Sequence, residues 1–585
     1  MFKWQTLSLD VPSLGQAVNL DNDNAREFLG LLKIYERTKK QCDDTNNSNT
    51  TDLESLESRV VQCLQSLQSS CLRKGLLQGN VDRAAELISN AEKQNMKKNT
   101  NQQNNGNKRR KRGGGSGNKS IAIFDENYIT NFESGVAVGN EMLIISALNK
   151  ILGSSSKESQ IFSYSIIQVA ADVLMSICQF VNTNIHQIRN NVSIQVEHDL
   201  IFGMHIQFLN GLVNTMNFVL KRMDNEDESN EVDVHADVIS SCCKAAARII
   251  SIVGTKLSRK KVLIEKVKST ADTILFHRNI HQLGMESSAM LLATLPLTGN
   301  MDGTPPQKLW TELVEQKSQS LCRVLNYFFP LQRSSVLHGS ATKEEQTWIN
   351  VVREKMINQS ERIIEFQRRV EGTAVLLLHL LNMDIYNQNS QLMLSHASVP
   401  AKLLLDLTEL MLAFPSVAET KYLSTKSRLC DISVENGLLS PNAAMMVANT
   451  VRFFGHDLYD ASVTIFQNNG LFHGKRIIRI AFASLQSCSS YAVRKTVDQS
   501  ILEKHFQGKK RRWLHCSLEL RIKAIKSIKV MITSIGSNAV TTQGSIIDKV
   551  LKLIAGCLLE QIDVQAPISS SSDDWGTMKD RITLT

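Results

Sequence analysis

Proline is nearly absent from the first half of this 585-residue chain. The sequence has nine prolines, and none falls between Pro12 and Pro296, although average usage is about 5%. A proline inside a helix removes a hydrogen bond and clashes with the preceding turn. So long a stretch without one favours long, uninterrupted helices, whereas the length alone would suggest roughly three or four domains.

Apolar residues recur at helical spacing along most of the chain. They make up 42% of it, with only 6% aromatic, and helical patterns return at intervals of about 20 to 40 residues, the period range of helical repeats. Strand-like alternation is nearly absent. We therefore predict an all-α fold, an irregular α-solenoid of HEAT- or armadillo-like helix pairs. Because the period is irregular, no repeat count is predicted.

Composition divides the chain into four predicted segments. Residues 96–119 are rich in basic residues, asparagine and glycine, and cannot bury enough apolar surface to become ordered. We interpret them as a disordered linker between two helical parts. The predicted segments are an N-terminal helical section (1–95), the linker (96–119), the α-solenoid (120–562) and a disordered C-terminal tail (563–585).

Several helix boundaries can be predicted from local signals. In "SPNAAMMVANTVRFFG", Ser440 suits the N-cap, Pro441 suits the first turn, and Gly455 would end the helix. The best N-terminal helix has one apolar stripe, made of Leu56, Val60, Cys63, Leu64 and Leu67.

Another helix is predicted from "LELRIKAIKSIKVMITSIG", which ends at Gly536. Its lysines fall off one apolar face, and "SIIDKVLKLIAGCLLEQ" follows as the predicted antiparallel partner. That face is made of Leu518, Ile522, Ile525, Ile532 and Ile535.

The net charge of +9 comes mainly from the linker. The chain has 66 Lys and Arg against 57 Asp and Glu, and eight of the basic residues lie in 96–119, which holds no acid. Without the linker the balance is 58 to 57. A general nucleic-acid binder spreads basic residues over a face to neutralise many phosphates. The near-neutral body of this chain does not have that composition.

Five consecutive basic residues inside the linker predict a nuclear-import signal that an import receptor binds. Short basic runs are typical of import signals or nucleic-acid patches, and the flexible setting leaves this run accessible. A phosphate loop is not expected, because Asn118 separates Gly117 from Lys119 where the pattern needs Gly-Lys-Ser/Thr. The five residues are Lys108, Arg109, Arg110, Lys111 and Arg112.

A second basic cluster stands before the isoleucine-rich helix, next to Trp513. Its charges beside an aromatic residue suit a contact with RNA or with an acidic partner. A solvated loop and the second half of an import signal are alternatives that the sequence leaves open. The cluster consists of Lys509, Lys510, Arg511 and Arg512.

Candidate catalytic and metal-binding groupings are incomplete. His277 and His281 are spaced i, i+4 on a predicted helix, but the glutamate of H-E-x-x-H and a third ligand are missing. His515 and Cys516 are neighbours in sequence and cannot face one another on a helix.

Two further groupings lead to the same conclusion. His235 lies near the adjacent Cys242 and Cys243, whose side chains point about 100° apart on a helix. "GHDLYD", from Gly455 to Asp460, is placed at a helix end and lacks a nucleophile. We expect no enzyme activity, no metal site and no cofactor.

The eleven cysteines are scattered and include no C-x-x-C pair. They indicate reduced, buried thiols in an intracellular protein. The first residues lack the apolar region of a signal peptide. No run of 18 apolar residues is present, so no membrane span is expected.

One stretch suggests a family. In the segment from Glu371 to Ser416, "ASVP" leads into a helix carrying "LLLDL" and leaving through "LMLAF". It resembles the helical-repeat region of the proline-, glutamate- and leucine-rich protein family, the animal counterparts of the yeast pre-ribosomal processing scaffold. The helix pair from Trp513 to Glu560 is similar to the next pair of that family.

The resemblance implies a non-catalytic nuclear or nucleolar scaffold in ribosome biogenesis. Such a scaffold helps mature the large subunit and process its precursor RNA. It implies WD-repeat and helical-repeat proteins of a pre-ribosomal complex as partners, and leaves direct contact with precursor RNA open. The alternative is an armadillo- or importin-like transport adaptor, with asparagine and tryptophan ladders along a groove. Five scattered tryptophans weigh against that alternative.

Overall fold

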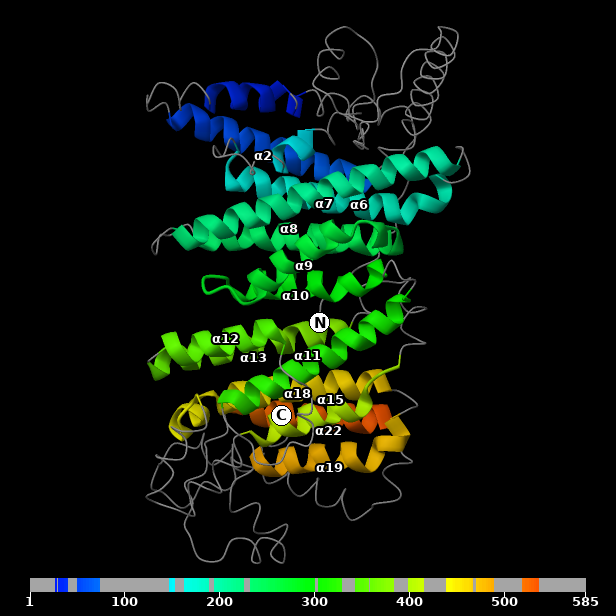
Figure 1. Ribbon diagram of the computed structural model, residues 1–585. Coiled ribbons are helices and arrows are strands. Elements are labelled where there is room, and N and C mark those ends of the chain that lie inside the picture. Colours follow the sequence, from blue (N-terminus) through cyan, green and yellow to red (C-terminus); the bar gives the residue numbers. More distant parts are fainter. Residues whose placement is uncertain are drawn as a thin grey trace, which may run out of the picture. The chain divides into compact units, whose positions relative to one another are not determined.

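The computed structural model describes the helical parts of the chain. Every element in them is a helix and none of the described residues forms a strand, which confirms the predicted all-α class (Figure 1). The chain divides into two compact units, 1–309 and 310–585. The described residues are 27–39 (without 29), 50–73, 147–152, 162–188, 194–225, 232–299, 304–328, 342–382 (without 357), 398–414, 438–466, 470–488 and 518–535.

Unit 1 contains six labelled α-helices, two 3₁₀ turns and two short helical stretches, 27–39 and 147–152. The labelled elements are α2 (Thr50–Arg73), α6 (Tyr164–Ile188), α7 (Ile194–Asn225), α8 (Val232–Val253), η1 (Gly254–Arg259), α9 (Lys261–Leu275), α10 (Gln282–Thr294) and η2 (Leu295–Thr298).

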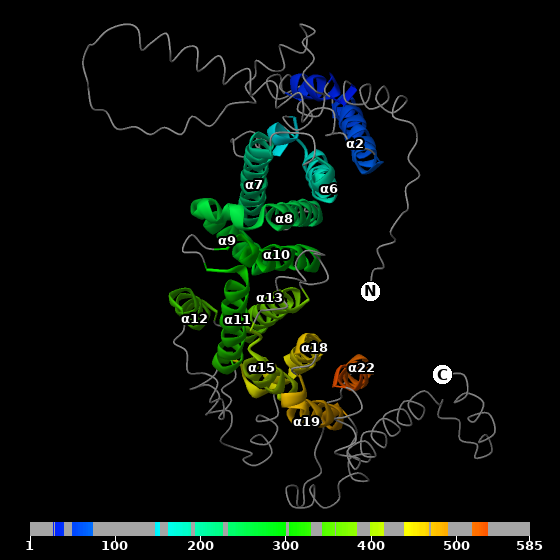
Figure 2. The same cartoon turned by 90° about the vertical axis from the view of Figure 1, so that its right-hand side faces the viewer.

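The helices of unit 1 pack in two rows. α2, α6, α8 and α10 follow one another in one row, and α7 and α9 form the other, with α7 on α8 and α9 on α10 (Figure 2). Because α8 has neighbours on several sides, the adjacent Cys242 and Cys243 are both buried, as the sequence predicts. On α2, Val60, Leu64 and Leu67 are buried, which confirms the core of its predicted stripe.

Unit 2 contains seven labelled helices, the first of which begins just before the boundary between the units. They are α11 (Pro306–Phe328), α12 (Lys343–Lys355), α13 (Gln359–Leu381), α15 (Ala401–Ala413), α18 (Pro441–Phe466), α19 (Gly470–Cys488) and α22 (Leu518–Ile535).

Unit 2 repeats the two-row arrangement. α13, α18 and α22 form one row, which we call the α18 row, while α15 and α19 form the α19 row; α15 packs on α18, and α19 packs on α22 (Figure 2). Aromatic rings join α11 to this core, with ring centroids 5.0 Å apart for Phe328 and Phe366 and 5.9 Å apart for Phe366 and Phe414. From α13 to α22, the labelled helices therefore alternate between rows.

α13 and α18 start side by side. Arg362 on the first turn of α13 donates to the Leu438 carbonyl oxygen, 3.3 Å away, just before α18. Ser440 is the N-cap of α18, as predicted, because its Oγ accepts from the Ala443 backbone N–H at 3.2 Å. The two helices of the row therefore run in the same direction.

The predicted end of this helix is wrong. α18 continues through Gly455 to Phe466. A Cβ atom at Gly455 would lie 3.0 Å from the Met411 Cβ and 3.2 Å from the Leu412 Cδ2 of α15. The glycine allows two helices to pack closely and does not stop one, so "GHDLYD" lies inside a helix.

Two further expectations are corrected. His277 and His281 do not share a helix, because α9 ends at Leu275 and α10 begins at Gln282. The isoleucine face predicted for α22 is not its buried face, since Ile522 is 42% exposed. The side chains that α22 buries are Leu520, Ala524, Ser527, Ile528 and Met531.

Candidate functional site

A buried polar cluster lies where α18, α19 and α22 meet. The His456 Nε2 is 2.9 Å from the Ser484 Oγ of α19, and its Nδ1 is 3.0 Å from the Ser527 Oγ of α22. Ser527 also hydrogen-bonds the side chain of Asp460, one turn after His456. His456 and Ser527 are each 1% exposed, and Ser484 is 4% exposed. One histidine thus connects three helices.

The hydrogen bonds in this cluster point in one direction. An ionised Asp460 only accepts, so Ser527 donates to it and accepts from the Nδ1–H of His456. The Nε2 atom then accepts from the Ser484 hydroxyl. Burial, with help from Lys523 and Arg452, lowers the pKa of His456 to about 3, so the ring is neutral at pH 7. Burial raises the pKa of Asp460 to about 6, so its carboxylate is ionised there.

This chain of groups resembles the arrangement that activates a serine nucleophile. Two features oppose that chemistry. An additional hydroxyl, Ser527, separates the imidazole from the carboxylate, and a histidine with a pKa of about 3 is a weak base at neutral pH. The small exposed fraction of Ser484 leaves a substrate no approach to its oxygen. We interpret the cluster as a structural connection between three helices.

Ion pairs add to the same helix contacts. Arg476 of α19 pairs with Asp406 of α15 and lies 2.9 Å from the Glu409 Oε2. Asp406 belongs to the leucine-rich motif, so the motif both begins a helix after Pro400 and supplies a partner to the next helix of its row. Lys523 of α22 pairs with Asp457 of α18.

A second polar group joins α11 and α12. Arg323 holds both carboxylate oxygens of Glu345, at 2.8 and 2.9 Å, and Glu345 closes a capping box with Thr342. Burial opposes the charge of Glu345, but the hydrogen bonds from Arg323 outweigh it and lower the pKa of the carboxyl. This group anchors the start of α12.

Both described tryptophans are engaged inside unit 2. Trp310 is 1% exposed and donates through Nε1 to the Leu380 carbonyl oxygen at 3.0 Å. Trp348 donates to the Glu365 Oε1 at 2.7 Å, and the Arg369 guanidinium lies 4.4 Å from its ring centroid. Neither side chain is available as part of a binding ladder.

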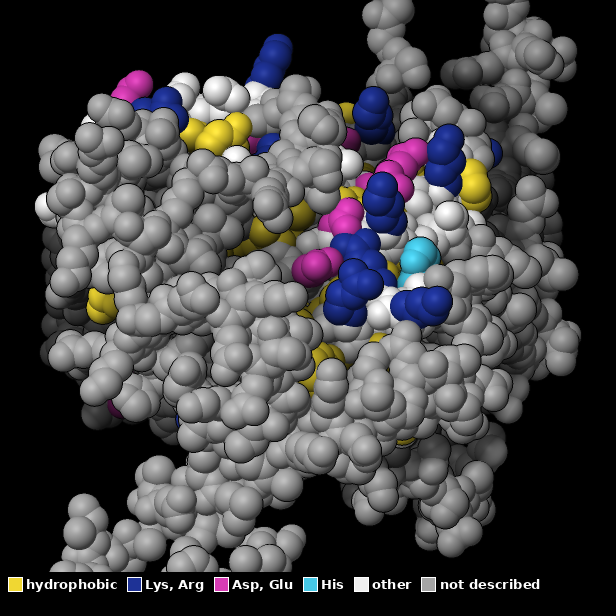
Figure 3. Space-filling view, turned by 90° about the horizontal axis from the view of Figure 1, so that it is seen from below, with side chains coloured by type: hydrophobic (Ala, Val, Ile, Leu, Met, Phe, Trp, Pro, Cys, Tyr) yellow, Lys and Arg dark blue, Asp and Glu magenta, His cyan; other side chains and the backbone are white. Residues whose placement is uncertain are grey.

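Charged side chains gather on α19, at the end of unit 2 seen in Figure 3. Its described residues include three basic side chains and no acidic one: Lys475 and Arg479 are exposed one turn apart, and Arg476 pairs with α15. α22 carries four basic residues and one acidic residue. Its exposed lysines are Lys526 and Lys529.

The histidines and cysteines of unit 1 form no metal site among the described residues. His277 Nε2 lies 3.0 Å from the Asp224 Oδ1 of α7, so it joins the turn before α10 to the other row. His235 packs edge-on against Tyr164, with ring centroids 4.4 Å apart. Burial raises the pKa of the Cys243 thiol to about 12, which keeps it protonated and unreactive at neutral pH.

The predicted site residues lie outside the described parts of the chain. This holds for the import-signal candidate, Lys108 to Arg112, for the second basic cluster, Lys509 to Arg512, and for the His515–Cys516 pair. Both clusters therefore stay predictions. The predicted segment boundaries near residues 95, 119 and 562 fall outside as well.

One helical stretch, Val234–Arg259, is long and apolar enough to cross a membrane. It comprises α8 and the turn after it, and 67% of its apolar window is buried against neighbouring helices. Such burial is what the core helix of a helical array has, and the stretch is weak evidence for a membrane.

His456 is the residue that sequence reasoning missed. Its segment was placed at a helix end, because Gly455 was interpreted as a stop. The available signal was the apolar spacing after Gly455, where Leu458 and Val463 continue the buried side of the helix to Phe466.

Compared with protein-family models, with curated proteins and with solved structures, the chain matches none.

Proposed function

We propose that this chain is a non-catalytic helical-repeat scaffold that holds other macromolecules together. The observation that carries the proposal is the two-row packing, which recurs in each unit, with the labelled helices alternating between rows from α6 to α10 and from α13 to α22. Such packing supports an α-solenoid of the HEAT or armadillo type, a class of protein whose long faces bind partners. The buried polar groups support it, because they connect helices.

We further propose that the scaffold works in the nucleus or nucleolus, in the maturation of the large ribosomal subunit and the processing of its precursor RNA. The leucine-rich motif supports this: α15 begins directly after Pro400, as the family resemblance leads one to expect. Its partners would be WD-repeat and helical-repeat proteins of a pre-ribosomal complex. An import receptor would bind Lys108 to Arg112, and Lys509 to Arg512 would contact RNA or an acidic partner.

Affinity purification of the tagged full chain from cells tests this function. We expect it to recover large-subunit precursor proteins and precursor RNA, and depletion of the chain should lead to accumulation of unprocessed precursor RNA. RNase treatment before elution separates protein partners from those held only through RNA. Recovery of transport receptors or cytoskeletal proteins alone would contradict the proposal.

The transport-adaptor alternative makes a different prediction. It needs tryptophans along an open groove, whereas Trp310 and Trp348 are engaged in contacts inside unit 2. A binding assay with basic signal peptides measures the difference. If the full chain binds such peptides tightly, the transport-adaptor function would replace the scaffold function.

A further inference from the structure

The exposed large apolar side chains of unit 2 lie on one row. All five belong to α13, α18 and α22, and the described residues of α11, α12, α15 and α19 expose none. Scattered single apolar residues on a surface need no explanation, but a contiguous group marks an interaction site. The five are Ile364, Met446, Phe453, Ile522 and Ile532.

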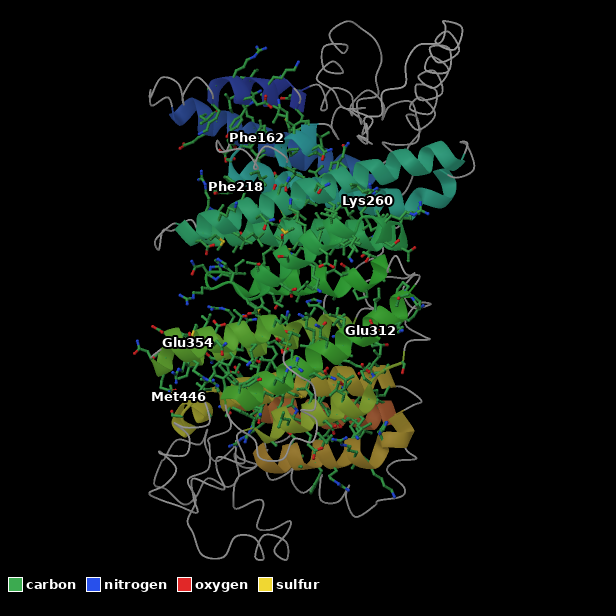
Figure 4. The ribbon with its side chains drawn as sticks, viewed as in Figure 1. Phe162, Phe218, Lys260, Glu312, Glu354 and Met446 are labelled. Atoms are coloured by element: carbon green, nitrogen blue, oxygen red, sulfur yellow. The ribbon has the colours of Figure 1, made fainter. Side chains whose placement is uncertain are left out.

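Three of these residues lie on two neighbouring helices, Met446 and Phe453 on α18 and Ile522 on α22. The Lys523 Nζ of α22 is 5.0 Å from the centroid of the Phe453 ring, and Lys523 also pairs with Asp457, one turn further along α18. Ile522 precedes Lys523 and lies on the exposed side of α22. Met446 lies about two turns before Phe453 on the same side of α18, and it is 75% exposed (Figure 4).

The charge next to these residues is positive. Lys526 is one turn after Ile522, and Lys529 follows it on the same exposed side of α22. Asp457 pairs with Lys523 and neutralises its charge. α22 itself has four basic residues and one acidic residue, Glu519, so its net charge is positive. We call Met446, Phe453 and Ile522, with Lys526 and Lys529, the α18–α22 face.

We infer that the α18–α22 face binds a short acidic amphipathic helix of a partner protein. An amphipathic helix presents apolar anchors at i, i+3 or i+4, and i+7, which suit an apolar strip two helical turns long. Acidic side chains beside those anchors pair with Lys526 and Lys529. The inference deepens the proposed scaffold function, because it names the chemistry of one partner.

RNA suits this face less well. Base stacking needs an open aromatic ring, and Lys523 already lies over the ring of Phe453. Met446 and Ile522 offer no hydrogen-bond donors, and two exposed lysines are few for a phosphate backbone.

The chain's own next helical segment also suits the face less well than an acidic partner does. In "SIIDKVLKLIAGCLLEQ", Lys549 and Lys552 balance Asp548 and Glu560. The segment has no negative excess to set against the lysines.

Fluorescence anisotropy with a synthetic probe tests the inference on the full chain. The probe is a labelled helical peptide with leucines on one side and glutamates on the other; its control carries lysines in place of the glutamates. We expect only the acidic peptide to bind. The double variant Met446→Ser/Ile522→Ser, and separately Lys526→Glu/Lys529→Glu, should each weaken binding about tenfold or more, as loss of an interface anchor does.

Matched controls change exposed apolar and basic side chains outside the α18–α22 face. Val262→Ser removes an 85% exposed apolar side chain from α9, and Lys475→Glu/Arg479→Glu reverses two exposed charges on α19. Both should bind the peptide like the wild type, with unchanged thermal melting. Equal loss in the controls, equal binding of the basic peptide or no binding of the acidic one would overturn the inference. Binding of a uridine-rich RNA to the wild type and the controls, but not to the face variants, would also overturn the inference.

A photo-crosslinker in place of Met446 identifies the occupant directly. We expect it to capture the acidic peptide, and capture of this chain's own residues 536–585 instead would overturn the inference. Affinity purification separates the two proposals. If the purification recovers pre-ribosomal partners but the acidic peptide does not bind, the scaffold function is supported and the binding role of the α18–α22 face is contradicted. If the peptide binds but no such partners are recovered, the binding role of the face is supported and the scaffold function is contradicted.

Discussion

His456 shows how one buried side chain can determine the packing of three helices. Its two ring nitrogens have partners on α19 and α22, which lie 28 and 71 residues further along the chain. A buried ring in this position specifies the rotation of both neighbouring helices, because a turn of either would leave a hydroxyl without its partner. The neutral ring is favoured by burial, so its role depends on pH.

Replacing His456 with leucine tests this role. The change removes the imidazole nitrogens that the Ser484 and Ser527 hydroxyls bond, so we expect a loss of about 1–3 kcal/mol in the free energy of unfolding at pH 7. Below about pH 6.5, His456 binds a proton in the unfolded wild type, whereas in the native state the ring stays neutral until about pH 3. The wild type therefore loses this advantage as pH falls, by up to about 1.4 kcal/mol per pH unit. Urea denaturation of both proteins from pH 4.5 to 8 measures the difference.

The pH dependence that Asp460 gives to stability has the opposite sign, and both the wild type and His456→Leu retain Asp460. Its raised pKa of about 6 makes its contribution to stability fall as pH rises from about 4 to 6, and the comparison cancels this slope. Ser462→Ala is the control, because the Ser462 Oγ is buried with no hydrogen-bond partner in the described parts of the chain. It should be neutral or slightly stabilising at every pH. A constant gap between the wild type and His456→Leu across the range would contradict the assignment.

At the scale of single helices, sequence signals predicted starts better than ends and faces. Ser440 and Pro441 mark the start of α18 correctly, because an N-cap is a local hydrogen bond. Gly455 led to the wrong helix end, because a glycine is needed there for close packing against α15, and no local sequence pattern connects α15 to this position. On α22, hydrophobicity pointed to Ile522, while the buried side uses Ala524 and Ser527, whose small size and hydrogen bond suit close packing.

Gly455→Val should therefore destabilise unit 2. The added side chain has no room against Met411 and Leu412, and overpacking of this kind costs about 1–3 kcal/mol. Thermal unfolding followed by circular dichroism measures it. Gly30→Ala is the matched control, since nothing lies within 4 Å of a Cβ there and alanine is the better helix former. Should Gly455→Val melt like the wild type, the close α15–α18 contact would be wrong.

For the whole molecule, the sequence predicted the class of fold but not its partition. Proline scarcity and apolar spacing are properties of long helices and can be seen residue by residue. The division after Leu309 has no comparable marker, since it follows from which helices contact one another. The same limit applies to the α18–α22 face, which exists only because α18 and α22 pack side by side in space.

The nuclear localisation of the protein is predicted from the sequence alone. Replacing Lys108 to Arg112 with alanine should abolish nuclear accumulation, while partners are retained in extracts and stability changes by less than about 0.5 kcal/mol. Fluorescence microscopy of the tagged variant measures localisation. Alanines at Lys509 to Arg512 form the control and should leave the chain nuclear. If the first variant stays nuclear and the second does not, the import signal belongs to the second cluster.

The alternation of helices between rows also bears on synthesis. Each helix of unit 2 finds its neighbours among helices that precede it closely in the chain, so α15 can settle on α11 and α13 as it emerges from the ribosome. Chains grow from the N-terminus at about 5–20 residues per second. α22 emerges last of the described helices and completes the contacts of His456. A nascent chain paused before residue 518 would present that imidazole to the chaperones that wait at the tunnel exit.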